Sequence, residues 1–179
     1  MTRLKSWLFA LIQFLPLSSF ASFAFWNGVP TSERWIQAFE YGTVAGLIQL
    51  MIIFFQPNPV NRLILGANLY LIVGGLAAFF QQWWLFKLYG SLQESAIFIF
   101  IFCVGLVSTF ATTAGFLSVQ TDAKERVRNY SYCLLAATAI ALVCSLLFQG
   151  NKALSVVIPI IVLALLQRYF TYKLKQFGN

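Results

Sequence analysis

Residues 62–87 have the sequence RLILGANLYLIVGGLAAFFQQWWLFK, and this stretch decides the fold class of the chain. No charged residue occurs between Arg62 and Lys87. The hydrocarbon core of a bilayer takes about 20 apolar residues of helix, so the stretch predicts a helix that crosses a membrane. The pair Trp83 and Trp84 is typical of a membrane–water boundary, where an indole keeps its N–H in water and its ring in lipid.

The composition of the whole chain supports the same class. Its 179 residues are 60% hydrophobic and only 9% charged, whereas soluble domains carry about 25% charged residues. The mean hydropathy is +0.78. We expect a single membrane domain over residues 1–179, with the lipid bilayer as its surroundings and no sizeable soluble domain. The Lys and Arg residues that give the net charge of +7 lie between apolar segments, where such cations direct topology. They do not indicate a nucleic-acid partner.

Six apolar segments predict an all-α integral membrane protein, a bundle of six transmembrane helices. The expected spans are about 4–26, 34–56, 60–86, 92–119, 130–149 and 152–172. The first segment resembles a signal peptide, with Arg3 and Lys5 before an apolar run and small residues near Ala24. We expect it to be retained as a span.

Helix-start and helix-stop signals place the boundaries. Thr31 or Ser32 is the expected N-cap of the second helix, with Glu33 in its first turn. Asn58, between two prolines, is a candidate cap for the third helix. Three further signals follow: Gly90 as a stop before the capping box 91–94, Asp122 as a cap for the fifth helix, and Gly150 with Asn151 as a stop and cap. Pro159 predicts a kink in the sixth helix.

The basic residues predict the orientation. With the N-terminus inside, nine of the 12 Lys and Arg residues lie on the cytoplasmic side: Arg3, Lys5, Arg62, Lys124, Arg126, Arg128, Arg168, Lys173 and Lys175. Arg34, Lys87 and Lys152 lie on the other side. Cytoplasmic loops of membrane proteins carry the excess of Lys and Arg, so both termini are expected in the cytoplasm.

The residue types that catalysis needs are scarce. The chain has no histidine, which removes histidine-ligated haem and zinc and histidine-activated nucleophiles. Of its five carboxylates, all but Glu40 fall at expected helix starts. The three cysteines form no CxxC pair. We therefore expect no enzymatic activity, no metal and no cofactor.

Glu40 is the ionisable residue that needs an explanation, because it lies inside the second predicted span. A charge at that depth is costly unless it faces water or a partner, and marks a candidate functional site. We predict an outward-facing polar cup formed by Gln37, Glu40, Gln82 and Lys87. The alternative is structural: Glu40 reaches the interface or pairs with Arg34 or Lys87.

Small residues predict close packing between helices. The second span carries Gly42 and Gly46 four residues apart, and the third carries Gly74 and Ala78, next to Gly75. Gly105 lies on a small-residue face of the fourth span. We interpret all six as helix-packing positions.

Short segments of the first half resemble the bacterial intracellular septation protein A family. Residues 13–17 (QFLPL) are similar to that family's N-terminal F-L-P run, residues 74–80 (GGLAAFF) to its G-G-L-T-L segment, and residues 86–87 (FK) to its F-I-K-W-K. Residues 81–84 (QQWW) stand where the family carries an acidic residue, and six spans are expected here where the family has five. The resemblance implies a septation-like scaffold of the cell envelope, without established catalysis.

We expect a non-enzymatic protein of the bacterial inner membrane, a scaffold or accessory subunit in cell-envelope or division processes. It would act by helix packing with membrane-protein partners or as a homo-oligomer. The alternative is a small transporter or channel for a small solute or ion, which would use the cup around Glu40. A transport path needs polar residues near the bilayer midplane, where the sequence offers only Gln49, Asn68, Ser108 and Thr109.

Overall fold

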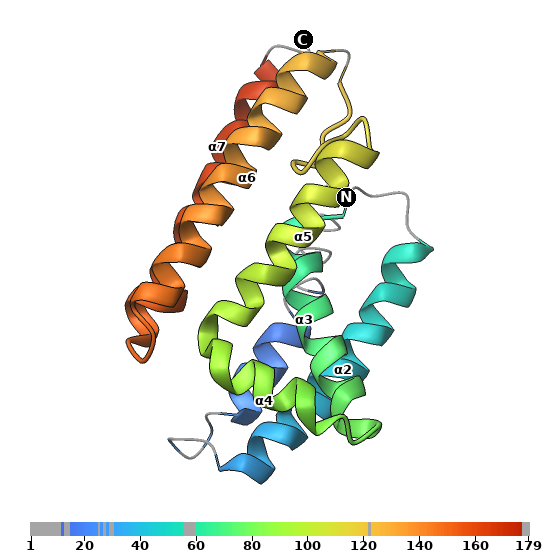
Figure 1. The fold of residues 1–179 in the computed structure, drawn as a ribbon. Helices are drawn as coiled ribbons and strands as arrows, with labels where there is room; N and C mark the ends of the chain where they lie inside the picture. Colours follow the sequence, from blue (N-terminus) through green and yellow to red (C-terminus); the bar gives the residue numbers. More distant parts are fainter. Residues whose placement is uncertain are drawn as a thin grey trace. The chain divides into compact units, whose positions relative to one another are not determined.

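The structure is a computed structural model that describes most of the 179-residue chain. The described residues are Ile12, 15–24, Trp26, Gly28, 31–55, 60–121 and 123–176. They form helices and turns, with no strand among them (Figure 1). The helices are α2 (Ser32–Phe54), α3 (Arg62–Phe79), α4 (Trp83–Leu92), α5 (Ala96–Ala111), α6 (Lys124–Leu147) and α7 (Ile158–Gln176). Two short segments, η1 (Gln93–Ser95) and η2 (Ala153–Val157), precede α5 and α7.

Five helical runs within this part of the chain are long and apolar enough to cross a membrane. They cover Glu33–Ile53, Arg62–Phe79, Trp83–Ala111, Lys124–Leu147 and Ala153–Gln176. The prediction of an all-helical protein with several apolar spans is therefore confirmed. The sixth predicted span, residues 4–26, lies largely outside the described residues, and what is described of it is a shorter apolar helix, Leu15–Ala24.

The chain divides into two compact units, which we describe separately. The first comprises residues 1–58 and 67–90, and so contains α2, most of α3 and most of α4. The second comprises residues 59–66 and 91–179, with the first turn of α3, η1, α5, α6, η2 and α7.

In the first unit, α2 and α3 run antiparallel and in close contact. Successive contacts join Gln49 to Asn68, Gly46 to Ile72 and Thr43 to Gly75, so residue numbers rise along one helix as they fall along the other. Phe39 is fully buried and packs its ring against Tyr70, with 5.5 Å between the ring centroids. The two spans are therefore neighbours, as their short connection predicts.

The end of α3 corrects the boundary predicted for the third span, which continued to residue 86. The helix ends at Phe79, and Gln81 takes a left-handed φ of +53°. The amide of Gln82 donates to the carbonyl of Ala77 at 2.8 Å, and the amide of Gln81 to that of Ala78 at 3.0 Å. These two bonds form a Schellman cap. Glycine usually occupies the left-handed position, and the sequence has glutamine there.

The start of the fourth span also differs from its prediction. The helix stop predicted at Gly90 is displaced by two residues, because α4 ends at Leu92. The expected capping box at 91–94 does not cap the next helix: its residues lie at the end of α4 and in η1, and Ser95, the N-cap of α5, makes no side-chain cap bond. The apolar run that is long enough to cross a membrane covers Trp83–Ala111 and includes the turn η1, and residues 113–118 form turns. The predicted range 92–119 therefore begins close to the break between α4 and α5, but it extends past the end of α5 at Ala111.

Other boundary signals had mixed outcomes. Thr31 caps α2 as predicted, since its Oγ1 accepts from the Arg34 amide at 3.3 Å. Asn58 and Asp122 lie outside the described residues. Asn61 caps α3, accepting from the Leu63 amide at 3.0 Å.

In the second unit, α6 and α7 form a long antiparallel hairpin, and α5 packs against α6 (Figure 1). The buried residues of α6 recur at helical spacing: Val127, Ser131, Leu134, Thr138, Ala141 and Ser145. Gly150 adopts a φ of +87° in the turn, and Asn151 accepts from the Leu154 amide at 3.4 Å, so the predicted stop and cap are confirmed. The π-helical turn η2 lies just before Pro159, where a kink was predicted.

Candidate functional site

The four residues of the predicted polar cup all belong to the first unit, and each is at least partly exposed. Gln37 and Glu40 lie on α2, three residues apart. Gln82 lies in the turn after α3, where its Nε2 donates to the Phe80 carbonyl at 3.1 Å and its Oε1 accepts from Trp84 Nε1 at 3.1 Å. Lys87 is exposed on α4.

Arg34 and Lys87 are the two cations considered above as structural partners of Glu40. Within the part of the chain that the structure describes, no salt bridge joins Glu40 to Arg34 or Lys87. The backbone of Glu40 lies about 12 Å along the helix from the start of α2 at Ser32, from a rise of 1.5 Å per residue. The helix around it has the length and hydropathy of a membrane span.

The surface of α2 beyond Glu40 is apolar and exposed over several turns. It carries Tyr41, Val44, Leu47, Ile48 and Met51, each between 43% and 64% exposed. This exposed face of α2, which we call the α2 face, consists of these five residues with Gln37 and Glu40. An apolar surface with a carboxylate and an amide near one end can contact lipid along most of its length and polar groups of another helix at that end.

The buried polar side chains of the first unit bond α2 to α3. Thr43 Oγ1 donates to the Leu71 carbonyl at 2.9 Å, and Asn68 Nδ2 donates to Gln49 Oε1. Gln49 Nε2 in turn donates to the Ile12 carbonyl at 2.9 Å. Gln49 and Asn68 are only 2% and 1% exposed. Polar side chains used in this way hold helices together in an apolar environment.

The predicted packing glycines of the first unit lie at close helix contacts. A Cβ at Gly42 would lie 3.3 Å from Phe20 Cβ, and one at Gly46 would lie 3.0 Å from Ile72 Cγ1. A Cβ at Gly74 would overlap the Phe39 ring, and one at Gly75 would overlap Thr43. Ala78 is buried one turn after Gly74.

Gly105, on α5 of the second unit, packs against a different kind of neighbour. A Cβ there would lie 2.6 Å from Cε1 of Phe116, whose ring belongs to the turns after α5. Gly105 therefore makes room for an aromatic ring that covers α5.

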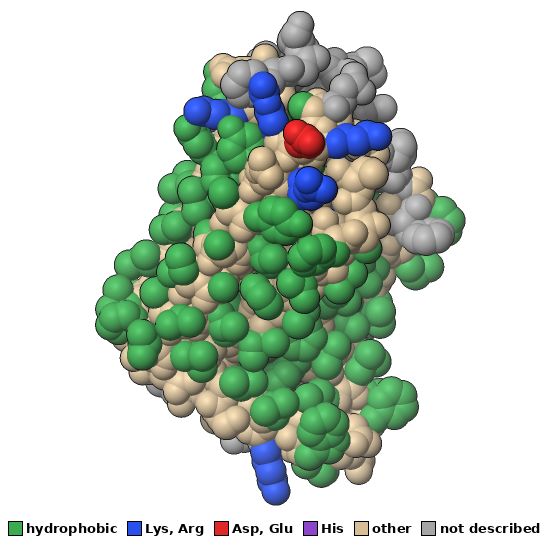
Figure 2. Space-filling view, turned by 45° about the horizontal axis from the view of Figure 1, so that its top comes forward, with side chains coloured by type: hydrophobic (Ala, Val, Ile, Leu, Met, Phe, Trp, Pro, Cys, Tyr) green, Lys and Arg blue, Asp and Glu red, His purple; other side chains and the backbone are tan. Residues whose placement is uncertain are grey.

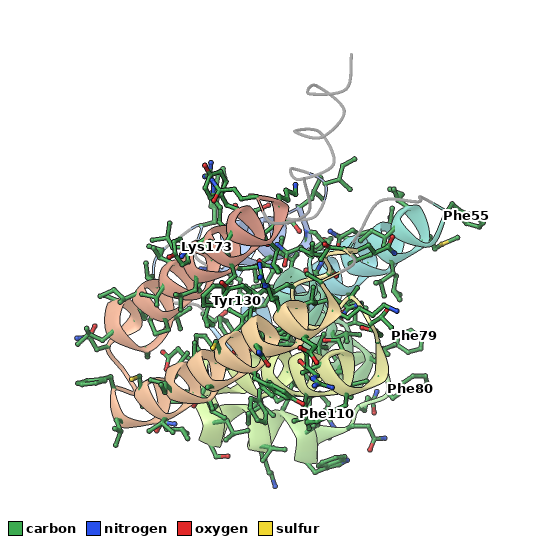
Figure 3. All side chains as sticks on the ribbon, turned by 90° about the horizontal axis from the view of Figure 1, so that it is seen from above. Phe55, Phe79, Phe80, Phe110, Tyr130 and Lys173 are labelled. Carbon is green, nitrogen blue, oxygen red and sulfur yellow. The ribbon has the colours of Figure 1, made fainter. Side chains whose placement is uncertain are left out.

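Large aromatic side chains extend outward from several helix ends. Figure 3 shows Phe55, Phe79 and Phe80 directed away from the ribbons, and they are 79%, 77% and 62% exposed. Phe110, near the end of α5, is 69% exposed. Exposed phenylalanine at this frequency suits contact with lipid rather than water.

Cations gather at one end of the second unit. Tyr130 of α6 stacks on Phe170 of α7 with 5.0 Å between centroids, so the start of α6 and the end of α7 lie together. This end therefore carries Lys124, Arg126, Arg128, Arg168, Lys173 and Lys175. Figure 2 shows several Lys and Arg side chains gathered at one end of the face in view, one at the opposite end, and a largely hydrophobic surface between them.

Arg62, at the start of α3, makes contacts within the second unit that the sequence did not predict. Its Nη1 donates to Thr112 Oγ1 at 2.8 Å and to the Gly115 carbonyl. Beside it in the chain, Asn61 Oδ1 accepts from Gln167 Nε2 of α7 at 3.1 Å. The partners are 50 to 106 residues apart, and no local pattern signals such pairs.

Neither metal chemistry nor similarity to known proteins adds to this description. Among the described residues, no group of three or more Cys, Asp or Glu side chains could hold a metal ion. Comparisons with protein-family models, curated protein sequences and solved structures gave no match. The functional argument therefore depends on the residues and contacts above.

Proposed function

We propose that the chain is a non-enzymatic scaffold or accessory subunit of the bacterial inner membrane, which binds other membrane proteins through the α2 face. The observation that carries the proposal is the exposed carboxylate of Glu40 on an apolar helix. A charge facing lipid at this depth is costly, so such residues usually contact polar partners. A partner helix with a cationic or amide side chain opposite Glu40 would remove that cost.

The use of the buried polar groups supports this function over transport. Thr43, Gln49 and Asn68 make their hydrogen bonds between helices of the first unit. A transporter instead needs polar groups that line a path near the bilayer midplane. The alternative of a small transporter or channel depends on the exposure of Gln37, Glu40, Gln82 and Lys87.

The orientation that we propose has both termini in the cytoplasm. The cations at one end of the second unit support it, because Lys124 and Lys173 lie at that end and Lys152 follows the turn at the other end of the α6–α7 hairpin. Such asymmetry is the pattern that fixes topology. The resemblance to the septation protein A family suggests division or envelope synthesis as the process served.

Photo-crosslinking in native membranes tests the partner. A crosslinking residue in place of Val44, on the α2 face, should give one discrete protein adduct. Glu40→Leu should abolish the adduct, whereas the control Glu33→Gln, which changes the exposed carboxylate in the first turn of α2, should leave it unchanged. An adduct that persists in Glu40→Leu would contradict the proposal.

A flux assay separates the alternative function. The purified chain in proteoliposomes should not accelerate solute or ion flux above the rate of empty vesicles. Flux that depends on Glu40 and is lost in Glu40→Gln would favour the transporter.

A further inference from the structure

Three segments of the second unit meet at the turn end of the α6–α7 hairpin: η1, the end of α6, and η2 (Figure 1). Both short segments depart from the α-helix. In η1, a 3₁₀ turn, Gln93 has a φ of +47°, and η2 is a five-residue π-helical turn. Such departures change the bonding of main-chain carbonyls, and π-turns are frequent at functional sites.

Three buried oxygen atoms in these segments have no hydrogen-bond partner among the described residues. They are Glu94 Oε2, Ser145 Oγ and Ser155 Oγ. Both serines are fully buried, at 0% exposure. An enclosed polar atom without a partner costs free energy, so each such atom in a native protein needs an explanation, for example an ion.

The same segments are held together by a glutamine from the turn. Gln149 Nε2 donates to the Leu92 carbonyl at 3.3 Å and to Ser95 Oγ at 3.4 Å. A buried helical hydroxyl commonly donates to the carbonyl one turn earlier, as Thr138 does to Leu134 at 2.8 Å. Ser145 makes no such bond, so its oxygen is open to another ligand.

We propose that Glu94, Ser145 and Ser155 form a binding site for a monovalent cation, and specifically for sodium. One carboxylate supplies one negative charge, and the two hydroxyls supply neutral hard oxygen ligands. Calcium takes six to eight oxygen ligands and usually several carboxylates, and transition metals prefer imidazole or thiolate. Interrupted helices supply carbonyls to sodium in other membrane proteins. This inference does not depend on the partner role of the α2 face.

Thermal unfolding of the purified full chain in detergent tests the site. The melting temperature is measured in sodium chloride and in choline chloride at equal ionic strength. Sodium at about ten times its dissociation constant should raise the melting temperature by about 3–6 °C, and choline should not. Glu94→Gln should remove the rise, and Ser145→Ala and Ser155→Ala should shift its midpoint to several-fold higher sodium.

Two control variants separate the loss of the sodium site from a general effect of substitution on stability. Ser131 is as buried as Ser145 and also lacks a hydrogen-bond partner among the described residues, but it lies toward the other end of α6. Ser131→Ala should keep the full sodium response, and so should Lys152→Gln, which changes the exposed cation just before η2.

Several results would overturn the proposal. They are an equal rise in choline, an undiminished rise in Glu94→Gln, or an equal loss in Ser131→Ala. A potassium response as large as that of sodium would overturn the choice of sodium. If Glu94→Gln does not fold, calorimetric titration of the two site serine variants with sodium chloride decides the matter, and binding as tight as that of the native chain contradicts the site.

Discussion

We expect Gly75→Ala to destabilise the first unit, because the structure has no space for the added methyl group. The new Cβ would lie 2.6 Å from Thr43 Cβ and 2.7 Å from the Phe39 carbonyl oxygen, and closer still to Thr43 Oγ1. The carbonyl belongs to the backbone of α2 and cannot rotate away. Overpacking of this kind costs about 1–3 kcal/mol.

Gly90→Ala is the matched control, since Gly90 also lies in a helix but a Cβ added there would meet no atom within 4 Å. At this position, alanine should stabilise the helix by about 1 kcal/mol. The two variants should therefore differ by about 2–4 kcal/mol. At about 2–4 °C per kcal/mol for a chain of this length, their melting temperatures should differ by at least about 4 °C.

The assay is thermal unfolding in detergent, followed by tryptophan fluorescence. Thr43→Ala combined with Gly75→Ala should recover only part of the loss, because the Oγ1 contact is removed while the Phe39 carbonyl stays. A Gly75→Ala variant as stable as the native chain would refute the α2–α3 packing. Equal destabilisation by Gly90→Ala would show that glycine itself, and not the contact, is responsible.

Three further substitutions test other contacts by the same assay. Asn68→Ala should destabilise by about 1–3 kcal/mol because it leaves the buried Gln49 oxygen unpaired; an unchanged melting temperature would contradict the buried amide pair. Arg62→Gln should destabilise by about 1.5–3 kcal/mol because charged hydrogen bonds at the start of α3 are lost, and a neutral result would show that these bonds do not form. Gly115→Ala should cost about 1–2 kcal/mol from its φ of +54° alone, plus a clash with Ser131 Oγ, so a stabilised variant would rule out this turn.

The all-helical fold with several apolar spans was predictable from the sequence because the length of an apolar run is a property of the chain itself. The same holds for boundaries that depend on neighbouring residues. Thr31 can cap α2 because its side chain reaches an amide three residues later, and Gly150 takes a positive φ at low cost.

The end of α3 and the start of α4 could not be predicted locally. The turn at Gln81 contains neither glycine nor proline, and its Schellman bonds only appear once the chain is folded. Gly90 and the capping-box residues that follow it have the local pattern of a break between helices, and the structure has such a break, the turn η1, three residues beyond Gly90. The positive φ at this break belongs to Gln93 and not to Gly90.

The site was predictable in part. Glu40 stands out in the sequence as a carboxylate inside an apolar run, and its exposure on α2 is what the partner proposal uses. The role proposed for Glu94 was hidden, because its helix-start pattern explained it without reference to Ser145 or Ser155. Those serines are 51 and 61 residues away in the sequence, and only the fold brings their segments together.

The composition of the native membrane particle tests the central claim most directly. The protein is extracted with its surrounding lipid in polymer nanodiscs, without detergent, and the particle mass is measured by native mass spectrometry. We predict that each particle contains the chain together with a second protein chain, either a different protein or another copy, and that Glu40→Leu releases it. Particles that contain one copy and lipid alone, in the native chain as in the variant, would contradict the account.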